Sequence, residues 1–187
     1  MIGRTVRLEP MTIEHLPALV EAGLHPELWQ WIPTPVTTPD EMGAYVETAL
    51  DEARRGVSIP FVIIDRATDR VIGSTRYANM STADRHLEIG WTWITPAFQR
   101  TAANTETKLL LLTHAFETLD CIRVELKTDA LNVKSRNAIL RIGAKEEGTF
   151  RKHRITASGR VRDTVYFSII DTEWPAVKAG LLARLDG

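Results

Sequence analysis

Three strand-like segments follow one another in the middle of the chain, and a strongly apolar helical segment comes directly after them. The segments 58–65, 70–79 and 86–94 are bounded by turn residues, and the third alternates apolar with polar residues throughout. The helical pattern over 104–119 has leucines around much of its circumference, which predicts burial along most of its length. These segments together favour a mixed α/β domain.

Further patterns extend this order towards both ends of the chain. Strands are expected at 5–10, 121–128, 144–155 and 161–171, and helices at 13–23, 40–55, 132–142 and 173–185. The order β-α-α-β-β-β-α-β-α-β-β-α contains no repeat and no linker, and 187 residues suit one domain with one core. We therefore expect a single α/β (α+β) domain over 1–187, with a mixed, mostly antiparallel sheet of about six to seven strands flanked by helices.

Residues 24–39 are predicted to form an irregular loop, because they contain the prolines Pro26, Pro33, Pro35 and Pro39. Trp29 and Trp31 indicate that this loop packs against the rest of the protein. Thr12 is the expected N-cap of the preceding helix, and Gly23 is its expected end.

The charge balance and the single cysteine exclude several classes of protein. With 23 Lys and Arg against 24 Asp and Glu, the chain lacks the basic excess of a nucleic-acid-binding protein. The N-terminus has no signal-peptide pattern and no apolar run approaches a membrane span, so we expect a cytoplasmic protein without membrane or nucleic-acid partners. Cys121 permits no intramolecular disulfide and is expected to be a buried structural thiol.

Common catalytic motifs are missing from the sequence. It contains no HExxH and no cysteine–histidine spacing for zinc, so no metal is expected. It also lacks GxSxG, GxGxxG and GxxxxGK[ST], which argues against serine-hydrolase, dinucleotide-binding and P-loop chemistry.

The loop FQRTAAN joins the strand at 86–94 to the helix at 104–119. Such a loop points unpaired backbone N–H groups at one place, where the helix dipole also favours an anion. It therefore predicts a seat for a phosphate or pyrophosphate, with Arg100, Thr101 and Lys108 around it. The same residues also fit a plain connection, with Thr105 as the N-cap and Glu106 in the first turn.

The whole chain resembles the GNAT superfamily of acyl-CoA-dependent N-acyltransferases, and most of all the branch of ribosomal-protein N-terminal acetyltransferases. The resemblance rests on HLEIGWTWITPAFQRTAANTETKLLLLTHAFE, RVELKTDALNVKSRNAILRIGAKEEGTFRKH and RVRDTVYFSII. The pyrophosphate signature of the family is Q/R-x-x-G-x-G/A. Gln99 matches its first position, whereas Ala102 and Asn104 replace its small residues, and no glycine occurs between Trp91 and Gly143.

The resemblance implies a GNAT fold and the transfer of an acetyl group from acetyl-CoA to a primary amine by direct attack in a ternary complex. The acceptor is either a protein N-terminus or a small-molecule amine. A non-catalytic CoA-binding or interaction module is the alternative from another class, and a homodimer through the sheet edge or the terminal helix is compatible with either.

The resemblance also implies which residues contact the co-substrate. Three strand residues would offer backbone groups to the pantetheine arm, the loop and helix start would hold the pyrophosphate, and an N-x-x-S helix start would hold the pantetheine and sulfur. In the same order these are Trp93, Ile94 and Thr95; Gln99, Arg100, Thr101, Ala102, Ala103, Asn104 and Thr105; and Asn132 and Ser135.

Two residues are expected to move protons. An amine is protonated at neutral pH and must lose a proton before it attacks, which a carboxylate achieves directly or through water. Glu88 occupies the position at which many members of the superfamily place a base; otherwise it faces solvent and pairs with a neighbour such as Arg76. Ser135 is the expected donor to the leaving thiolate, because Ile139 or Leu140 falls where many members have a tyrosine.

The acceptor side is the least defined from sequence. Trp29 and Trp31 occupy the region that usually shapes the acceptor groove, although core packing explains them equally well. The segment RKHRITASGRVR is basic and fits an acidic acceptor, the CoA 3′-phosphate or a solvated hairpin. The acidic helix at 40–55 fits a cationic acceptor or an ordinary solvated face.

Overall fold

The computed structural model describes residues 1–32 and 34–186; the part of the predicted loop that falls on Pro33 lies outside the described residues. The strands are β1 (Val6–Pro10), β2 (Ser58–Asp65), β3 (Val71–Ser81), β4 (His86–Ile94), β5 (Arg123–Asp129), β6 (Lys145–Ile155) and β7 (Val161–Ile170). The helices are α1 (Leu16–Gly23), α2 (Pro26–Trp29), α3 (Pro39–Arg54), α4 (Ala102–Glu117), α5 (Val133–Arg141) and α6 (Trp174–Asp186), with short 3-10 helices η1 (Ile13–His15) and η2 (Pro96–Phe98).

The seven strands form one sheet in the order β1-β2-β3-β4-β5-β7-β6. β4 and β5 pair in parallel, whereas the other neighbouring strands pair antiparallel. The prediction of a mixed, mostly antiparallel sheet flanked by helices is confirmed.

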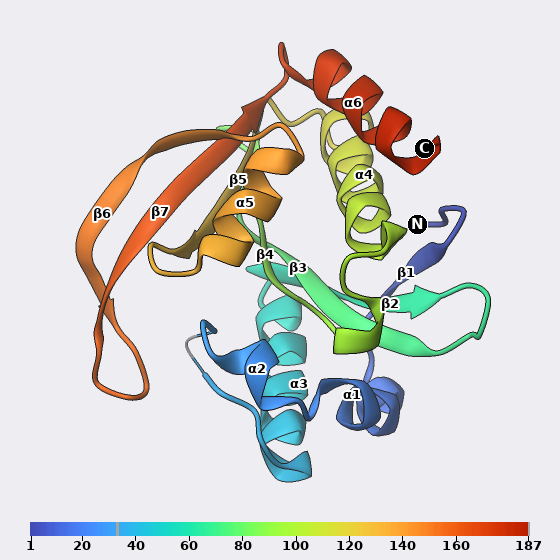
Figure 1. The fold of residues 1–187 in the computed structure, drawn as a ribbon, viewed down its shortest axis with the longest axis vertical. Coiled ribbons are helices and arrows are strands. Elements are labelled where there is room, and N and C mark those ends of the chain that lie inside the picture. Colours follow the sequence, from blue (N-terminus) through green and yellow to red (C-terminus); the bar gives the residue numbers. More distant parts are fainter. Residues whose placement is uncertain (33, 187) are drawn as a thin grey trace.

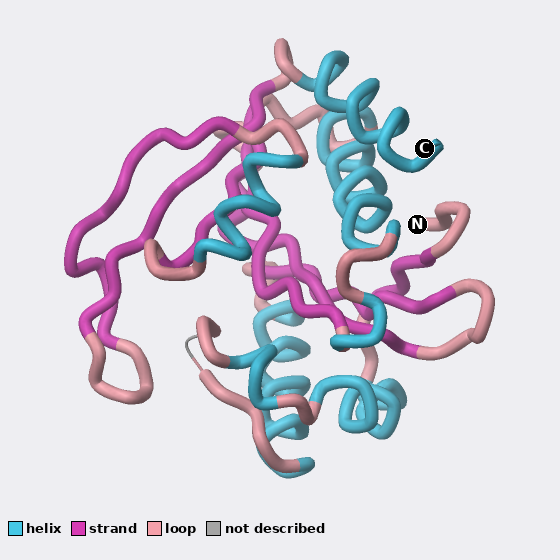
Figure 2. The backbone as a smooth tube through the Cα atoms, in the orientation of Figure 1, coloured by secondary structure: helices cyan, strands magenta, loops and turns pink. Residues whose placement is uncertain are grey.

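Helices cover both faces of the sheet (Figures 1 and 2). α4, α5 and α6 pack on one face, around a core that includes Leu111, Phe167 and Leu181. α1, α2 and α3 pack on the other face, around a second core that includes Met42 and Trp93. The sheet therefore separates the two cores. Groups bound on its opposite faces can come into contact only where two strands move apart.

Two predicted elements are wrong in detail. The segment 24–39 is not wholly irregular, because α2 forms one turn with Pro26 at its first position, where proline fits a helix. α4 begins at Ala102 and not near Asn104 or Thr105. Its N-cap is Thr101, whose hydroxyl accepts a hydrogen bond from the N–H of Ala103 at 3.2 Å.

The N-terminal strand is fastened to α4 by one buried carboxylate. Glu106 accepts hydrogen bonds from the backbone N–H groups of Arg4, Thr5 and Val6 at 2.6–2.7 Å and from the Thr5 hydroxyl at 2.7 Å. Burial alone would raise the pKa of Glu106, but these hydrogen bonds outweigh it and the pKa is lowered. Glu106 therefore stabilises the fold as a carboxylate and is not part of the predicted phosphate site.

The parallel pair β4–β5 separates soon after it begins. Only His86–Glu88 pair with Arg123–Glu125, so Ile89–Ile94 and the end of β5 diverge. A bulge in β4 contributes to this, because the pairing with β3 shifts register next to Trp91, which adopts a positive φ of 49°. We call the wedge between these diverging segments the strand opening.

Gly73 on β3 sets how closely β4 approaches at the strand opening. A Cβ on Gly73 would lie 2.2 Å from the carbonyl oxygen of Trp93 and 3.0 Å from the Cα of Ile94. We expect Gly73→Ala to lower the free energy of unfolding by about 1–3 kcal/mol in denaturant titrations. Gly180→Ala on α6, where no atom lies within 4 Å of the new methyl, is the matched control and should be neutral or stabilising. An unchanged midpoint for Gly73→Ala would contradict this close approach.

None of the described helices is both long enough and apolar enough to cross a membrane.

Candidate active site

The end of β4 presents backbone groups to the strand opening. The N–H of Thr95 bonds to the carbonyl of Ile72 on β3 at 2.8 Å. Because successive strand residues point their backbone groups in opposite directions, those of Ile94 face the opening and those of Trp93 face β3. The side-chain amide of Gln99 donates a hydrogen bond of 2.8 Å to the carbonyl oxygen of Ile94. Of the three predicted strand contacts, Ile94 thus has the backbone N–H best placed for a ligand, while its carbonyl is bonded to Gln99.

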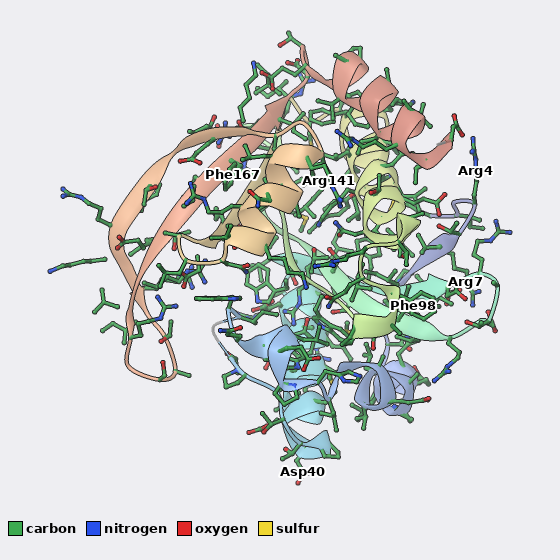
Figure 3. All side chains as sticks on the ribbon, in the orientation of Figure 1. Arg4, Arg7, Asp40, Phe98, Arg141 and Phe167 are labelled. Carbon is green, nitrogen blue, oxygen red and sulfur yellow. The ribbon has the colours of Figure 1, made fainter. Side chains whose placement is uncertain are left out.

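The start of α4 forms the second wall of the opening. Arg100 takes a positive φ of 61°, and Thr101 then caps the helix. Ala102, Ala103 and Asn104 lie within the first helical turn, so the two positions that carry small residues in the family signature need no positive φ here. The missing glycines therefore leave the loop without backbone strain at those positions. Phe98, labelled in Figure 3, lies on η2 between β4 and this loop.

Lys108 does not lie at the predicted phosphate seat. It is buried under the β4 bulge, where its ammonium donates a hydrogen bond of 2.8 Å to the hydroxyl of Thr92, which is itself 2.8 Å from the hydroxyl of Thr75. Burial lowers the pKa of Lys108 to about 7. The expectation that Lys108 surrounds the pyrophosphate is wrong, because the helix turns this side chain towards the sheet and away from the loop.

The start of α5 lies across the opening from β4. The side chain of Asn132 accepts a hydrogen bond from the N–H of Ser135 at 3.0 Å, which makes Asn132 the N-cap that the sequence suggests. Within the described part of the chain, the hydroxyl of Ser135 and the amide N–H₂ of Asn132 donate to no protein acceptor. Lys134 donates to Gln99, which ties the start of α5 to the end of β4.

Glu88 is buried on the opposite face of the sheet, with 6% of its surface exposed. One carboxylate oxygen, Oε2, accepts hydrogen bonds from Asn79 and from the ammonium of Lys127, the latter at 2.9 Å. The other oxygen, Oε1, lies 3.1 Å from the place of a Cβ on Gly90, so the absent side chain leaves it uncovered. The alternative reading, a solvent-facing Glu88 paired with Arg76, is wrong, because Arg76 pairs with Glu52 at 3.0 Å.

Lys127 and Asn79 are site residues that the sequence analysis missed. Burial lowers the pKa of Lys127, but the hydrogen bond and the charge of Glu88 outweigh this effect and raise it, so Lys127 is a cation. Its ammonium also lies 4.7 Å from the centre of the Tyr166 ring. The sequence does show that Lys127 lies on the opposite face of its strand from the buried Leu126. The contact with Glu88 can be predicted only when it is known that β4 lies next to β5.

The two tryptophans of the α2 segment have different places. Trp29 is 2% exposed and packs on Tyr45 and Trp93, with ring centres 5.3 and 5.6 Å away. It supports the site from within the core and presents no surface to an acceptor. Trp31 is half-buried beneath the guanidinium of Arg160, 5.6 Å from its ring centre, and lies at the surface beside the β6–β7 hairpin.

Cys121 is buried just before β5, and burial raises the pKa of its thiol, in agreement with the expected structural role.

The fold and the strand opening define a class: an α/β domain in which two parallel strands separate beside the start of a helix. The chain belongs to the GNAT family, because the family model described as "Acetyltransferase (GNAT) domain" matches residues 5–145.

Individual relatives agree with this assignment. The chain is 30% identical over 181 residues to a protein of Bacillus subtilis (strain 168) named "Putative ribosomal N-acetyltransferase YdaF", with 93% of this chain and 94% of that protein covered. A crystal structure of a GCN5-related N-acetyltransferase from Brucella melitensis superposes with a TM-score of 0.91 at 33% identity, covering 98% of this chain and 84% of that one. RimJ of Mycobacterium smegmatis, solved in complex with CoA-disulfide, shares the fold with a TM-score of 0.82 at 24% identity, covering 96% and 88%. The chain is an acetyl-CoA-dependent N-acetyltransferase.

Proposed function

We propose that this enzyme acetylates the N-terminal amine of a protein or peptide by direct attack on acetyl-CoA within a ternary complex. The observation that carries the proposal is the buried Glu88, with one carboxylate oxygen held by Lys127 and the other uncovered beside Gly90, where β4 and β5 begin to separate. An amine on the α3 face and a thioester on the α5 face would meet there. The Bacillus subtilis relative is named "Putative ribosomal N-acetyltransferase YdaF", and this supports a protein acceptor over a small molecule.

The residues around the opening fit acetyl-CoA. The backbone N–H of Ile94 and the side-chain N–H₂ of Asn132, which donates to no acceptor within the described residues, are suited to the amide-rich pantetheine arm. The first N–H groups of α4, with Gln99, Arg100 and Thr101 before them, are suited to the pyrophosphate. Acetyl-CoA supplies the acetyl group as an activated thioester.

Glu88 acts as the base in this proposal. An α-amino group with a pKa of about 8 is mostly protonated at neutral pH, so it needs an acceptor for one proton before it attacks. Oε1 of Glu88 is the free oxygen that takes this proton, directly or through one water, while Lys127 and Asn79 hold Oε2 in place.

Ser135 acts as the proton donor to the departing thiolate, because its hydroxyl has no competing protein acceptor in the described residues. The buried thiol of Cys121 is unsuited to carry an acyl group, which favours direct transfer.

The test is thermal unfolding of the purified protein with acetyl-CoA, CoA or NAD. A ligand at 100 times its Kd adds about 2.7 kcal/mol of stability, which raises Tm by about 5–10 °C for a chain of this size. We expect this rise with both CoA species and none with NAD. No rise with either CoA species would overturn the proposed seat and favour an interaction module.

Replacement of Ser135 tests the proton donor. We expect Ser135→Ala to lower kcat about tenfold, less than usual for proton transfer because a thiolate is a good leaving group. KM for acetyl-CoA should change little, since Asn132 remains. Thiol release during turnover measures both constants, with Ser158→Ala in the hairpin turn as the matched control. An unchanged kcat would remove Ser135 from the reaction.

A further inference from the structure

The β6–β7 hairpin carries three arginines on one surface, which we call the arginine face: Arg154, Arg160 and Arg162. Arg154 and Arg162 are directly paired across the two strands, so their side chains leave the sheet on the same side. Arg160 lies just before β7 and bonds to Asp129, the carboxylate that Arg162 also approaches, so it lies on the same side. Like charges placed opposite each other destabilise a strand pair, so this arrangement needs a reason other than stability.

A β-bulge produces the pairing of the two arginines. The register between β6 and β7 shifts between Phe150 and Arg154, and Lys152 adopts a positive φ of 50°. The backbone N–H of Lys152 donates to Asp163 at 2.6 Å. Asp163 is thereby used in holding the bulge, and as a neighbour of Arg162 in the strand it points to the other side of the sheet.

Only one carboxylate directly contacts the arginine face in the described structure. Asp129 accepts from Arg160 through Oδ2 and from the N–H of Leu131 through Oδ1 at 3.0 Å. The Nε of Arg162 lies 3.8 Å from the same Oδ2, which is too long for a hydrogen bond. One carboxylate thus lies beside two of the three guanidinium groups, and Arg154 forms no ion pair within residues 1–32 and 34–186.

Arg162 is the key residue of the arginine face. It is 7% exposed, and its Nε donates to the hydroxyl of Thr164 at 3.1 Å. Its two Nη groups donate to no protein acceptor among residues 1–32 and 34–186. Burial, followed by the charges of Arg154 and Arg160, lowers the pKa of Arg162, although Asp129 and Glu88 act in the opposite direction. A guanidinium buried to this degree with free donors is suited to receive an anion.

The arginine face lies on the acceptor side of the sheet. Arg162 alternates with Thr164 and Tyr166, and Tyr166 is in contact with Lys127, the partner of Glu88. α4 and α5, which offer the phosphate and pantetheine contacts, cover the opposite face. The CoA 3′-phosphate is therefore not the anion that this surface would receive. Figure 1 shows the tip of the hairpin curving towards α2, where Arg160 covers Trp31.

We propose that the arginine face binds a carboxylate of the acceptor and thereby positions its amine at Glu88, so that the enzyme prefers acidic acceptors. This deepens the proposed function and rests on it. Arg162 is bonded to Thr164, whereas Lys127, the partner of Glu88, contacts Tyr166. Thr164 and Tyr166 are two residues apart on β7, which separates them by about 7 Å, the length of two residues of extended peptide. The spacing suits an acidic side chain at the second or third residue of a peptide N-terminus, whereas the carboxylate of a free amino acid is much closer to its amine.

The acidic helix α3 does not oppose this preference. Its residue Glu52 is bound to Arg76, whose guanidinium lies between the rings of Tyr45 and Trp91 at 4.6 and 5.5 Å. The negative charge of Glu52 is thereby compensated by Arg76 within the protein. Glu52 is thus no argument for a cationic acceptor.

The experiment compares matched acceptors by binding and by acetyl transfer. The probes are the C-terminally amidated peptides Ala-Glu-Ala-Ala and Ala-Ala-Glu-Ala, each beside its glutamine counterpart, and free alanine beside alaninamide. Calorimetry in the presence of CoA measures binding, and mass spectrometry with acetyl-CoA measures transfer. We expect about tenfold tighter binding of a glutamate peptide than of its glutamine counterpart, the effect of one charge-assisted contact.

Three arginine variants decide whether this preference comes from the hairpin. Arg162→Gln and the exposed Arg154→Gln should both reduce the preference to less than about threefold, while binding of the glutamine peptides stays as in the parent. Arg154→Gln keeps the test valid if loss of the buried Arg162 disturbs folding. Arg141→Gln on α5, labelled in Figure 3 and on the opposite side of the sheet from the arginine face, is the matched control and should keep the full preference.

Each outcome separates this inference from the proposed function. Equal binding of glutamate and glutamine peptides would overturn the carboxylate site even if both are acetylated, which would leave the transferase proposal intact. A preference confined to alanine over alaninamide would overturn the proposed spacing to a peptide side chain and would assign the acceptor to a small molecule. A retained peptide preference in both hairpin variants would also overturn the site. Selective binding without any transfer would support the site and contradict the proposed function.

Discussion

Glu88→Gln should lower kcat/KM for an amine acceptor by about 10²–10⁴ at neutral pH, the usual contribution of a positioned base. Glutamine keeps the shape of the side chain but cannot take a proton at Oε1. The residual rate should rise with pH, because an amine with a pKa of about 8 loses its proton to solvent as the pH approaches 9. Initial rates of thiol release between pH 6 and 9 measure both effects.

Glu125→Gln is the matched control for this prediction. Glu125 lies beside Glu88 in the parallel pair and also contacts Lys127, at 3.4 Å. Its substitution removes one charge from the same cluster without touching the proposed base, so activity should remain within about threefold of the parent. If both variants lose activity equally, the effect belongs to the charge of the cluster. If Glu88→Gln keeps the parent rate over the whole pH range, Glu88 is not the base.

Glu106→Gln should produce the largest loss of stability among single polar substitutions near the site. Four donors on the N-terminal strand converge on this carboxylate, and an amide would turn its N–H₂ group towards some of them. The buried N–H groups left without an acceptor should lower the free energy of unfolding by about 3 kcal/mol or more, which corresponds to a fall in Tm of about 6–12 °C. Glu117→Gln on the exposed end of the same helix is the control, with a loss below about 1 kcal/mol.

The pH dependence of stability should identify the same carboxylate. The pKa of Glu106 is lowered in the folded protein, so its contribution is fully present above its unfolded pKa of about 4.3 and is lost as the pH falls through the lower folded value. The difference in unfolding free energy between the parent and Glu106→Gln should therefore be constant near neutral pH and shrink below about pH 4. A difference that is independent of pH down to 3 would contradict a charged Glu106.

Local patterns predicted the elements of this fold well where alternation or periodicity was regular. The strand at 86–94 matches β4 (His86–Ile94) residue for residue, because apolar and polar residues alternate until Pro96 follows. The start of α4 was misplaced by two or three residues, since Thr101 and Thr105 are both competent N-caps. The left-handed conformation of Arg100 makes Thr101 the N-cap, and no residue pattern predicts this conformation at an arginine.

The candidate site was harder to predict, because it depends on contacts between strands distant in sequence. Glu88 stands out as a polar residue in an aromatic strand, but its partner Lys127 comes from the parallel neighbour β5. Trp29 and Trp31 look alike in sequence, yet the turn of α2 sends one into the core and leaves the other near the surface. The β-bulge that pairs Arg154 with Arg162 has no signature in the sequence, so the sequence alone does not distinguish this hairpin from an ordinary solvated one.

In the proposed complex, acetyl-CoA enters the strand opening and rests on the start of α4. Amide hydrogen exchange followed by mass spectrometry, with and without acetyl-CoA, locates this contact in the chain. We predict slower exchange over residues 92–105 and 132–136, with the β6–β7 hairpin unchanged. Protection confined to the hairpin or to the α3 face, or no protection at saturating acetyl-CoA, would contradict this position of acetyl-CoA.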